Sequence, residues 1–237
     1  MINFGITERG DAGLDFEWEN HLQPGNIIIS KSLNDKLIEK LVLHQKQCIF
    51  HMTCTGYGRT IVEPNVQPFK WTINQYSKLI QAGFPANQII LRVDPIIPTE
   101  KGIKLAINVI QAYLQQCPIQ NPRVRFSFLD MYPHVKQRFL EAKISLPYDT
   151  FIAPYNLREK CLKELRKLPI QLEACAENVS EKIGCISKKD YDTLNLDFEE
   201  TNFQKQRKDC ACCCKKIELL NTPKQCAHKC LYCYWKY

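Results

Sequence analysis

Short apolar segments alternate with longer amphipathic segments along most of the chain, and this alternation narrows its possible folds more than any other feature. Six segments rich in branched and aromatic residues have the length and composition of buried strands: 2–6, 26–30, 48–53, 88–93, 124–129 and 170–174. Five intervening segments repeat apolar residues at helical spacing: 34–45, 72–82, 102–116, 132–142 and 156–168. A strand-then-helix repeat predicts a parallel sheet covered by helices.

The fold class expected from this repeat is α/β, as a partial or complete (β/α) barrel of the triosephosphate isomerase type. An open doubly wound sheet is the alternative, and both folds form their sites where the strands end. The pattern weakens after about residue 178. We therefore expect a barrel core in residues 1–178 and a cysteine-rich tail, packed on that core, in residues 179–237.

Composition restricts the kind of protein further. Hydrophobic residues make up 45% of the 237 residues and charged residues 24%, as in folded globular proteins. No apolar run is long enough to span a bilayer, and the first ten residues lack the order of a secretory signal. We therefore expect a cytoplasmic protein without a membrane partner. The formal net charge of +7 is spread along the chain, which does not favour a nucleic-acid partner.

Cysteine usage is unusual, with 13 cysteines in the chain and seven in its last 28 residues. Clustered thiols in a cytosolic chain favour a metal or catalytic site over disulfides. The sharpest pattern is CxxxCxxC at Cys226, Cys230 and Cys233, with Tyr232 directly before the third cysteine. Three thiolates on one loop can hold three irons of a cubane [4Fe–4S] cluster and leave the fourth iron open. A closed structural zinc site is the alternative interpretation.

The spacing and the aromatic residue resemble the cluster loop of the radical S-adenosylmethionine (radical SAM) superfamily. The resemblance implies that SAM chelates the open iron and that Tyr232 lies near its adenine. In that superfamily the loop usually follows the first strand, whereas here Cys233 lies four residues from the end of the chain. We therefore expect the tail to fold back over the mouth of the barrel.

Most of the chain is similar to a family catalogued as a domain of unknown function, DUF1848. The similarity depends on four segments in this order: Glu63–Val66, Arg92–Ile97, Ser127–Asp130 and the tail from Gln206 to Tyr234. Three features depart from the usual family form. Thr7–Asp11 stands where a more basic loop is expected, and Lys229 occupies a position where glycine is more usual. The segment after the second strand is shorter and lacks the usual Trp-Thr-Lys-Asn-Pro.

The family resemblance also implies a second site, in which Cys175 and Cys185 join Cys210 and Cys212. Four thiolates would close an iron–sulfur cluster or hold a zinc ion. The roles of Cys213 and Cys214 stay open at this point. They are spare, change the register of ligation, or cap the open iron of the first cluster.

Polar residues near the carboxyl ends of the predicted strands are the candidates for ligand contacts. As substrate-binding residues we expect Glu8, Arg9, Asp11, His51, Thr53, Arg92 and Asp94, and as cofactor contacts Tyr232, Ser127 and Glu173. Simpler interpretations exist for some of them. Arg92 and Asp94 could form a salt bridge at the rim, and a histidine within a strand is more often a core residue.

The radical SAM resemblance implies an enzyme. One-electron reduction of bound SAM yields a 5′-deoxyadenosyl radical that abstracts hydrogen from a substrate. We expect a lyase acting on a small modified nucleobase, with an electron donor such as flavodoxin or ferredoxin. The specific hypothesis is queuine lyase, which releases 7-aminomethyl-7-deazaguanine from queuine. The alternatives are a radical SAM enzyme that acts on nucleic acid and a non-catalytic iron–sulfur or zinc protein.

Overall fold

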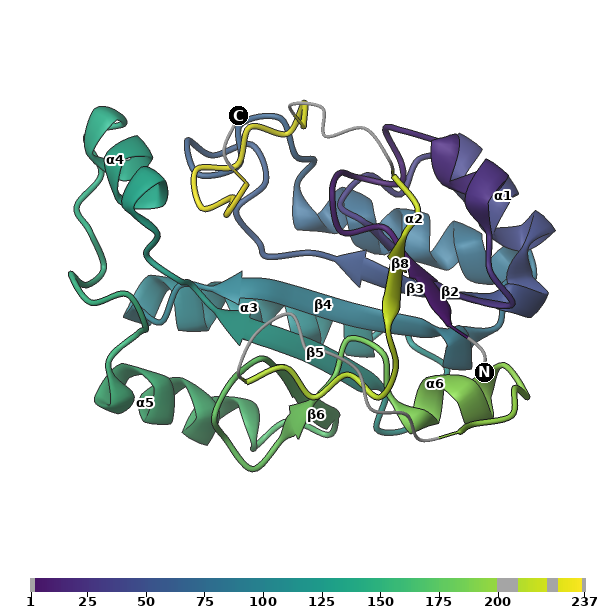
Figure 1. Ribbon diagram of the computed structural model, residues 1–237. Coiled ribbons are helices and arrows are strands. Elements are labelled where there is room, and N and C mark those ends of the chain that lie inside the picture. The colour runs from purple at the N-terminus through teal and green to yellow at the C-terminus, as the bar shows by residue number, and fades with distance from the viewer. Residues whose placement is uncertain (1–2, 200–208, 221–225, 236–237) are drawn as a thin grey trace.

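The computed structural model describes residues 3–199, 209–220 and 226–235 (Figure 1). Parallel strands form one sheet in the order β7-β6-β5-β4-β3-β2-β1-β8. Its strands are β1 Phe4–Ile6, β2 Gly25–Ser30, β3 Cys48–Thr53, β4 Ile89–Ile96, β5 Arg123–Phe128, β6 Gln171–Cys175, β7 Lys182–Ile183 and β8 Lys216–Glu218.

Helices follow most of the strands. They are α1 Asp35–Leu43, α2 Phe69–Gln81, α3 Glu100–Leu114, α4 Pro133–Glu141, α5 Tyr155–Leu165 and α6 Lys188–Thr193, with short 3₁₀ helices at Glu17–His21, Gln45–Gln47 and Ala86–Gln88. Side chains cap α1 and α3, because Asn34 accepts from Leu37 N at the start of α1 and Thr99 accepts from Gly102 N at the start of α3. Among the described residues, no helix combines the length and hydropathy needed to cross a membrane.

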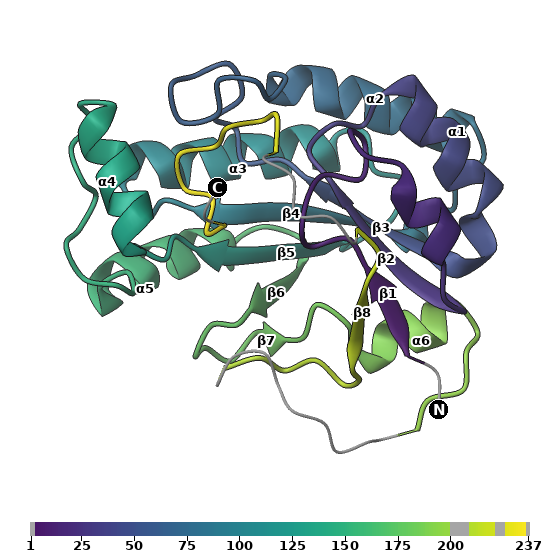
Figure 2. The same ribbon diagram turned by 45° about the horizontal axis from the view of Figure 1, so that its top comes forward.

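The sheet curls into a half-barrel. Figures 1 and 2 show α1, α2, α3 and α5 along its convex side, while α6 lies on the other side. The helices pack onto the outward side chains of the strands in one core cluster. The strand order runs without reversal from β1 to β6, so the doubly wound alternative is not observed. The half-barrel agrees with the expected partial barrel.

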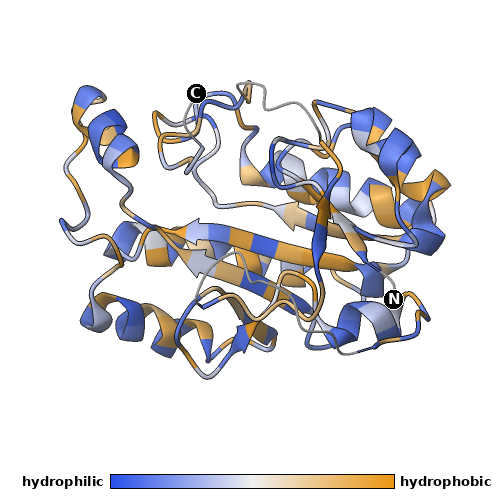
Figure 3. Ribbon diagram, in the orientation of Figure 1, coloured by the Kyte–Doolittle hydropathy of each residue, from blue (hydrophilic) through white to orange (hydrophobic). Residues whose placement is uncertain are grey.

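Successive side chains of a strand point to opposite faces of the sheet, and this period decides which residues reach the site. In β3, Phe50 and Met52 belong to the outer core, whereas Ile49 belongs to a second cluster on the concave face. His51 and Thr53 share the face of Ile49 by the same alternation. Figure 3 shows the result as alternating hydrophobic and hydrophilic bands along β4.

Residues after β7 fill the concave face at its lower end, where the strands begin. Phe4, Ile27 and Ile49 pack there against Tyr191 of α6 and against the segment that contains Cys212. The rings of Phe4 and Tyr191 have centroids 4.7 Å apart. This packing closes the lower end of the half-barrel with apolar side chains and leaves the carboxyl ends of the strands for a site.

All six predicted strands and all five predicted helices are confirmed, with small shifts at their ends. The sequence did not indicate β7, β8 or α6, which are short and lack an apolar run. They lie beyond residue 178, and β7 and β8 extend the sheet at its two edges. The segment 179–237 therefore contributes to the same sheet as the predicted core.

Candidate functional site

A cavity of about 460 Å³ lies at the carboxyl ends of the strands. Its walls come from the ends of β1 to β6, from Arg138, Cys185, Cys210 and Lys216, and from the cysteine loop, the name used here for residues 226–235. The wall residues from the strands and their following loops include Glu8, Asp11, Lys31, Thr53, Arg92, Asp94, Ser127 and Cys175. The volume lies in the range of small-molecule sites.

The loop after β3 holds the cysteine loop from one side. Leu231 N donates to Val62 O at 3.0 Å, and Asn65 Nδ2 donates to Ala227 O at 2.6 Å. The buried Tyr232 hydroxyl donates to the carboxylate of Glu63. The Glu63–Val66 segment, which the sequence marks only as a family feature, therefore docks the cysteine loop.

Asp11 holds the same loop from the side of β1. Its carboxylate lies 2.9 Å from Nε2 of the buried His228 and also accepts from Lys31 N at 2.7 Å. Burial opposes ionisation of Asp11, but the hydrogen bond and charge of His228 lower its pKa. Asp11 is thus a positioning residue for the cysteine loop as well as part of the cavity wall.

Helix α4 and the loop after β1 fix the last described residues. Arg138 donates to Cys233 O at 2.6 Å and to Trp235 O at 2.8 Å, and Trp235 Nε1 donates to Glu8 O at 3.1 Å. The described residues 226–235 therefore lie against three separate parts of the half-barrel rim, where Figures 1 and 2 show the yellow loop.

Cys226, Cys230 and Cys233 all line the cavity, and we call them the thiol trio. Burial raises the pKa of Cys226 to about 11 and that of Cys230 to about 12, while the charge of Lys31 opposes both shifts. Lys229 between them has φ 52°, a left-handed conformation that favours glycine. This explains why glycine is more usual at that position.

Cys175, Cys185, Cys210 and Cys212 come together from separate segments, and we call them the thiol tetrad. The sulfurs of Cys175 and Cys185 are 3.0 Å apart, and Cys212 hydrogen-bonds to both Cys185 and Cys210. Donation from Cys175 lowers the pKa of Cys185 well below its usual value, and donation from Cys212 lowers that of Cys210 to about 6. Three tetrad residues, all but Cys212, also line the cavity.

A glycine allows the two tetrad segments to approach. A Cβ atom on Gly184 would lie 2.4 Å from Cys212 Cα, so a side chain there would push the segments apart. Cys213 and Cys214 are not among the residues that line the cavity. Cys213 N donates to Ile186 O at 3.1 Å, and Cys214 packs in the cluster of Tyr191.

The family comparison bears on both thiol groups. A family model described as "Domain of unknown function (DUF1848)" matches residues 26–235. The chain belongs to the DUF1848 family. A search of curated proteins found no match. Within the described part of this DUF1848 chain, no group of three or more histidine, cysteine, aspartate or glutamate side chains is arranged to hold a single metal ion.

Three half-buried basic side chains at the cavity are each paired with a carboxylate. Lys31 Nζ lies 3.1 Å from Glu63, and Lys216 Nζ lies 2.7 Å from Glu8. The third pair joins Arg92 to Asp94, whose carboxylate also accepts from the hydroxyl of Ser127. The salt bridge that the simpler interpretation expected for Arg92 and Asp94 is therefore present, and both residues still line the cavity.

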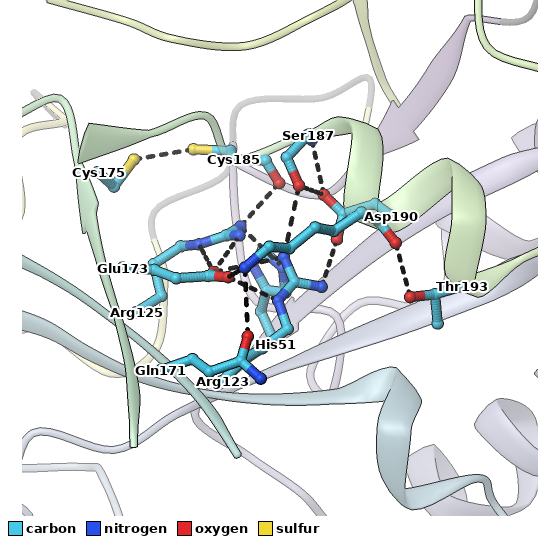
Figure 4. A network of polar contacts seen from close by, with 11 residues as sticks. His51, Arg123, Arg125, Gln171, Glu173, Cys175, Cys185, Ser187, Asp190 and Thr193 are labelled. Atoms are coloured by element: carbon cyan, nitrogen blue, oxygen red, sulfur yellow. Dashed lines mark hydrogen bonds and ion pairs between the residues drawn. The ribbon is translucent and has the colours of Figure 1, made fainter. Parts of the chain in front are cut away.

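A second polar network lies one layer below the cavity (Figure 4). Glu173 accepts from Arg125 at 2.6 Å and from Arg123 at 2.7 Å, and Arg123 also binds Asp190 at 2.7 Å. Arg125 Nη1 donates to Cys185 O at 2.8 Å and lies 3.2 Å from His51 Nε2. The network ties β5 and β6 to α6 and supports the tetrad from beneath.

This network changes the expected roles of two residues. Glu173 and His51 do not line the cavity, because arginines engage both side chains below it. Burial and the charge of Arg125 lower the pKa of His51 well below its usual value, which leaves it a neutral core residue. Arg9 also lies off the wall, exposed and with its guanidinium 5.9 Å from the ring centre of Trp235.

The structure brings the other predicted residues together. Glu8, Asp11, Thr53, Arg92, Asp94, Ser127 and Tyr232 all line the cavity. Sequence reasoning missed Lys31, Glu63, Lys216 and His228. Lys31 follows β2 directly, so the rule that selected Asp94 could have found it. Lys216 carries no such signal, because β8 is a three-residue strand whose place beside β1 is set by long-range pairing.

Proposed function

We propose that this DUF1848 protein is a radical SAM enzyme in which the thiol trio holds three irons of a [4Fe–4S] cluster and the fourth iron takes SAM. One observation carries the proposal: the three thiols of one loop face the same cavity as the polar carboxyl ends of the strands. Thiolates are the usual ligands of such clusters. A small molecule in the cavity would therefore lie beside the cluster loop.

The residues around the trio suit this cofactor. Contacts with Asp11, Glu63 and Asn65 hold the cysteine loop in place. Lys31 lies 5.2 Å from the ring centre of Tyr232 and supplies positive charge near Cys230. Such charge favours thiolate over thiol and so favours binding of iron. Tyr232 would contact the adenine of SAM, and Ser127 would lie on the opposite wall.

When bound, the cluster and SAM would supply a 5′-deoxyadenosyl radical and methionine at the expense of one electron, and the radical would take a hydrogen atom from the substrate. We propose flavodoxin or ferredoxin as the class of electron donor. The chain's own residues bind and orient the substrate and exclude water.

The proposed substrate is a small modified nucleobase, and the specific hypothesis is queuine lyase. The cavity has room for a small molecule, and carboxylates such as Glu8 and Asp94 lie on its wall, where they can accept hydrogen bonds from the ring N–H and amino groups of a deazapurine. Charge pairing at the cavity does not favour nucleic acid, because phosphate recognition needs unpaired cations.

The thiol tetrad would hold a second iron–sulfur cluster or a zinc ion. Lys216 and Arg92 lie close enough to lower the pKa of Cys185, which suits an anionic metal site. Because three of its cysteines reach the same cavity, a cluster there could pass electrons to the trio, whereas zinc would only join the segments.

The test is anaerobic reconstitution with iron and sulfide, followed by addition of SAM and dithionite. We expect release of 5′-deoxyadenosine, which queuine should stimulate. Cys230→Ala should abolish release, whereas Cys117→Ala, a half-buried cysteine away from the cavity, should not. Full iron loading without deoxyadenosine would instead identify a non-catalytic iron–sulfur protein.

A further inference from the structure

Two buried hydrogen-bonding atoms at the cavity lack a partner in the described part of the chain. They are Oγ1 of Thr53 and Nε of Arg92. Thr53 is 5% exposed, and both residues line the cavity. Buried polar groups in folded proteins are nearly always hydrogen-bonded, because an unmade bond costs free energy. Two such atoms on one cavity wall therefore point to a ligand that completes them.

The two atoms belong to one place in the sheet. Thr53 of β3 and Arg92 of β4 are register partners, so their backbones lie side by side. Both side chains share the concave face, since Thr53 alternates with Met52 and Arg92 with Leu91, which pack in the outer core. A single ligand group between the two strands can therefore meet both atoms.

Neighbouring residues fix the guanidinium of Arg92. Its Nη2 pairs with Asp94, and Asp94 is held in turn by the hydroxyl of Ser127. The pair with Asp94 uses one nitrogen of the guanidinium and leaves Nε–H as a donor without a partner. A preorganised donor of this kind discriminates between ligands, because it loses its bond when the acceptor is missing.

Charge at the cavity restricts the ligand further. The half-buried cations Lys31, Arg92 and Lys216 are each matched by a carboxylate. Arg138 binds backbone carbonyl groups of the cysteine loop, and Lys229 is exposed at the rim. Among the described residues of the cavity wall, no half-buried cation is thus left for a phosphate. The acceptor that fits here belongs to an uncharged group.

We propose that Thr53 and Arg92 form a specificity site that binds a carbonyl oxygen of an uncharged, non-phosphorylated substrate. Arg92 Nε and the Thr53 hydroxyl both donate to this oxygen. The inference rests on the proposed function, whose substrate class it narrows to a free base or nucleoside and from which it excludes nucleotides and nucleic acid.

Binding of small probes to the reconstituted protein, measured anaerobically by calorimetry, tests the site. The probes are 7-deazaguanine, its analogue without the 6-oxo group, and 7-deazaguanosine 5′-monophosphate. We expect 7-deazaguanine to bind at least about 10-fold more tightly than either of the others. Thr53→Val should weaken the binding of 7-deazaguanine about 5- to 10-fold. The affinity for the 6-deoxo analogue should not change, because that analogue has no carbonyl oxygen to accept from the hydroxyl.

Two further variants control the result. Thr55→Val removes a buried hydroxyl that accepts from Tyr57 N and does not line the cavity, so it should leave binding unchanged. Arg92→Lys keeps a cation for Asp94 but lacks the guanidinium Nε. It should weaken the binding of 7-deazaguanine at least as much as Thr53→Val does.

The outcomes separate this inference from the proposed function. Loss of deoxyadenosine release concerns the cluster, whereas probe binding is measured without turnover. The inference is overturned if the monophosphate binds most tightly, if 7-deazaguanine does not bind, or if Thr53→Val leaves its affinity unchanged. The inference is also overturned if Thr53→Val weakens the binding of SAM instead of 7-deazaguanine, because the acceptor would then belong to the cofactor.

Discussion

The two thiol groups of this protein differ in how the chain assembles them. The trio lies within eight residues of one loop, and burial raises the pKa of Cys226 and of Cys230. The tetrad combines residues up to 37 positions apart, and its thiols hydrogen-bond to one another so that Cys185 and Cys210 have lowered pKa values. The trio lies on one loop, which suits a site that stays open to a ligand on one side. The tetrad instead joins separate segments of the fold.

The surroundings of the two groups differ in the same way. Separate hydrogen bonds from different parts of the rim hold the loop of the trio, such as the one between Asp11 and His228. The tetrad lies above a charged network in which Arg125 binds both Glu173 and the backbone of Cys185. We therefore expect substitutions at the trio or its loop to affect deoxyadenosine release and SAM binding. Substitutions at or below the tetrad should affect the stability of the fold.

The largest expected contrast is between Cys230→Ala and Cys185→Ala. Cys230→Ala should lower deoxyadenosine release by more than about 100-fold, because losing a proposed iron ligand should cost more than losing a residue that only orients such a ligand. Its melting temperature should stay near that of the wild type. Cys185→Ala should lower the melting temperature by several degrees. Calorimetric melting and product analysis on both variants check this. A strongly destabilised Cys230→Ala protein would show that the trio is structural.

Arg125→Met should cause the next largest effect. It leaves Glu173 buried with one partner fewer, which typically costs about 3–5 kcal/mol, or a fall in melting temperature of roughly 6–20 °C. Chemical denaturation measures the loss. Arg166→Met, which removes surface ion pairs with Glu181 and Glu159, is the matched control and should change stability by less than about 1 kcal/mol. Equal losses in the two variants would contradict a supporting role for the network.

Asp11→Asn should weaken the hold on the cysteine loop. A neutral amide pairs poorly with His228, so we expect SAM affinity to fall about 10- to 100-fold, as for other contacts that orient metal ligands. Equilibrium binding of SAM measures this on the reconstituted protein. Glu17→Gln, an exposed change in the segment that follows the same strand, should bind SAM like the wild type. Unchanged affinity in Asp11→Asn would show that the rim contacts do not position the loop.

The smallest effect concerns Glu181, which directly precedes β7. The hydrogen bond from Arg166 lowers its pKa to about 2, below the usual 4.5. A lowered folded pKa stabilises the protein above about pH 4.5, and this contribution is lost as the pH falls toward 2. Because the pair is partly exposed, Glu181→Gln should cost less than about 1 kcal/mol at pH 7. Denaturation curves of variant and wild type should converge between pH 4.5 and 2, and a constant difference would contradict the assignment.

The sequence alone determined strands β1 to β6, helices α1 to α5 and the edge at which the site forms. Apolar periodicity is a local property, so it located β1 to β6, and their carboxyl ends supplied Thr53, Arg92, Asp94 and Ser127. The trio was equally visible, because its spacing lies within one short segment.

Tertiary structure decided which of these residues meet. Lys216 reaches Glu8 only because β8 pairs with β1 across more than two hundred residues, and Glu63 contacts Tyr232 only because the tail returns to the rim. Glu173 was expected to contact a ligand, but Arg123 and Arg125 bind its carboxylate below the cavity. Such pairings depend on contacts between distant segments, and the local pattern of residues does not encode which partner each charged group finds.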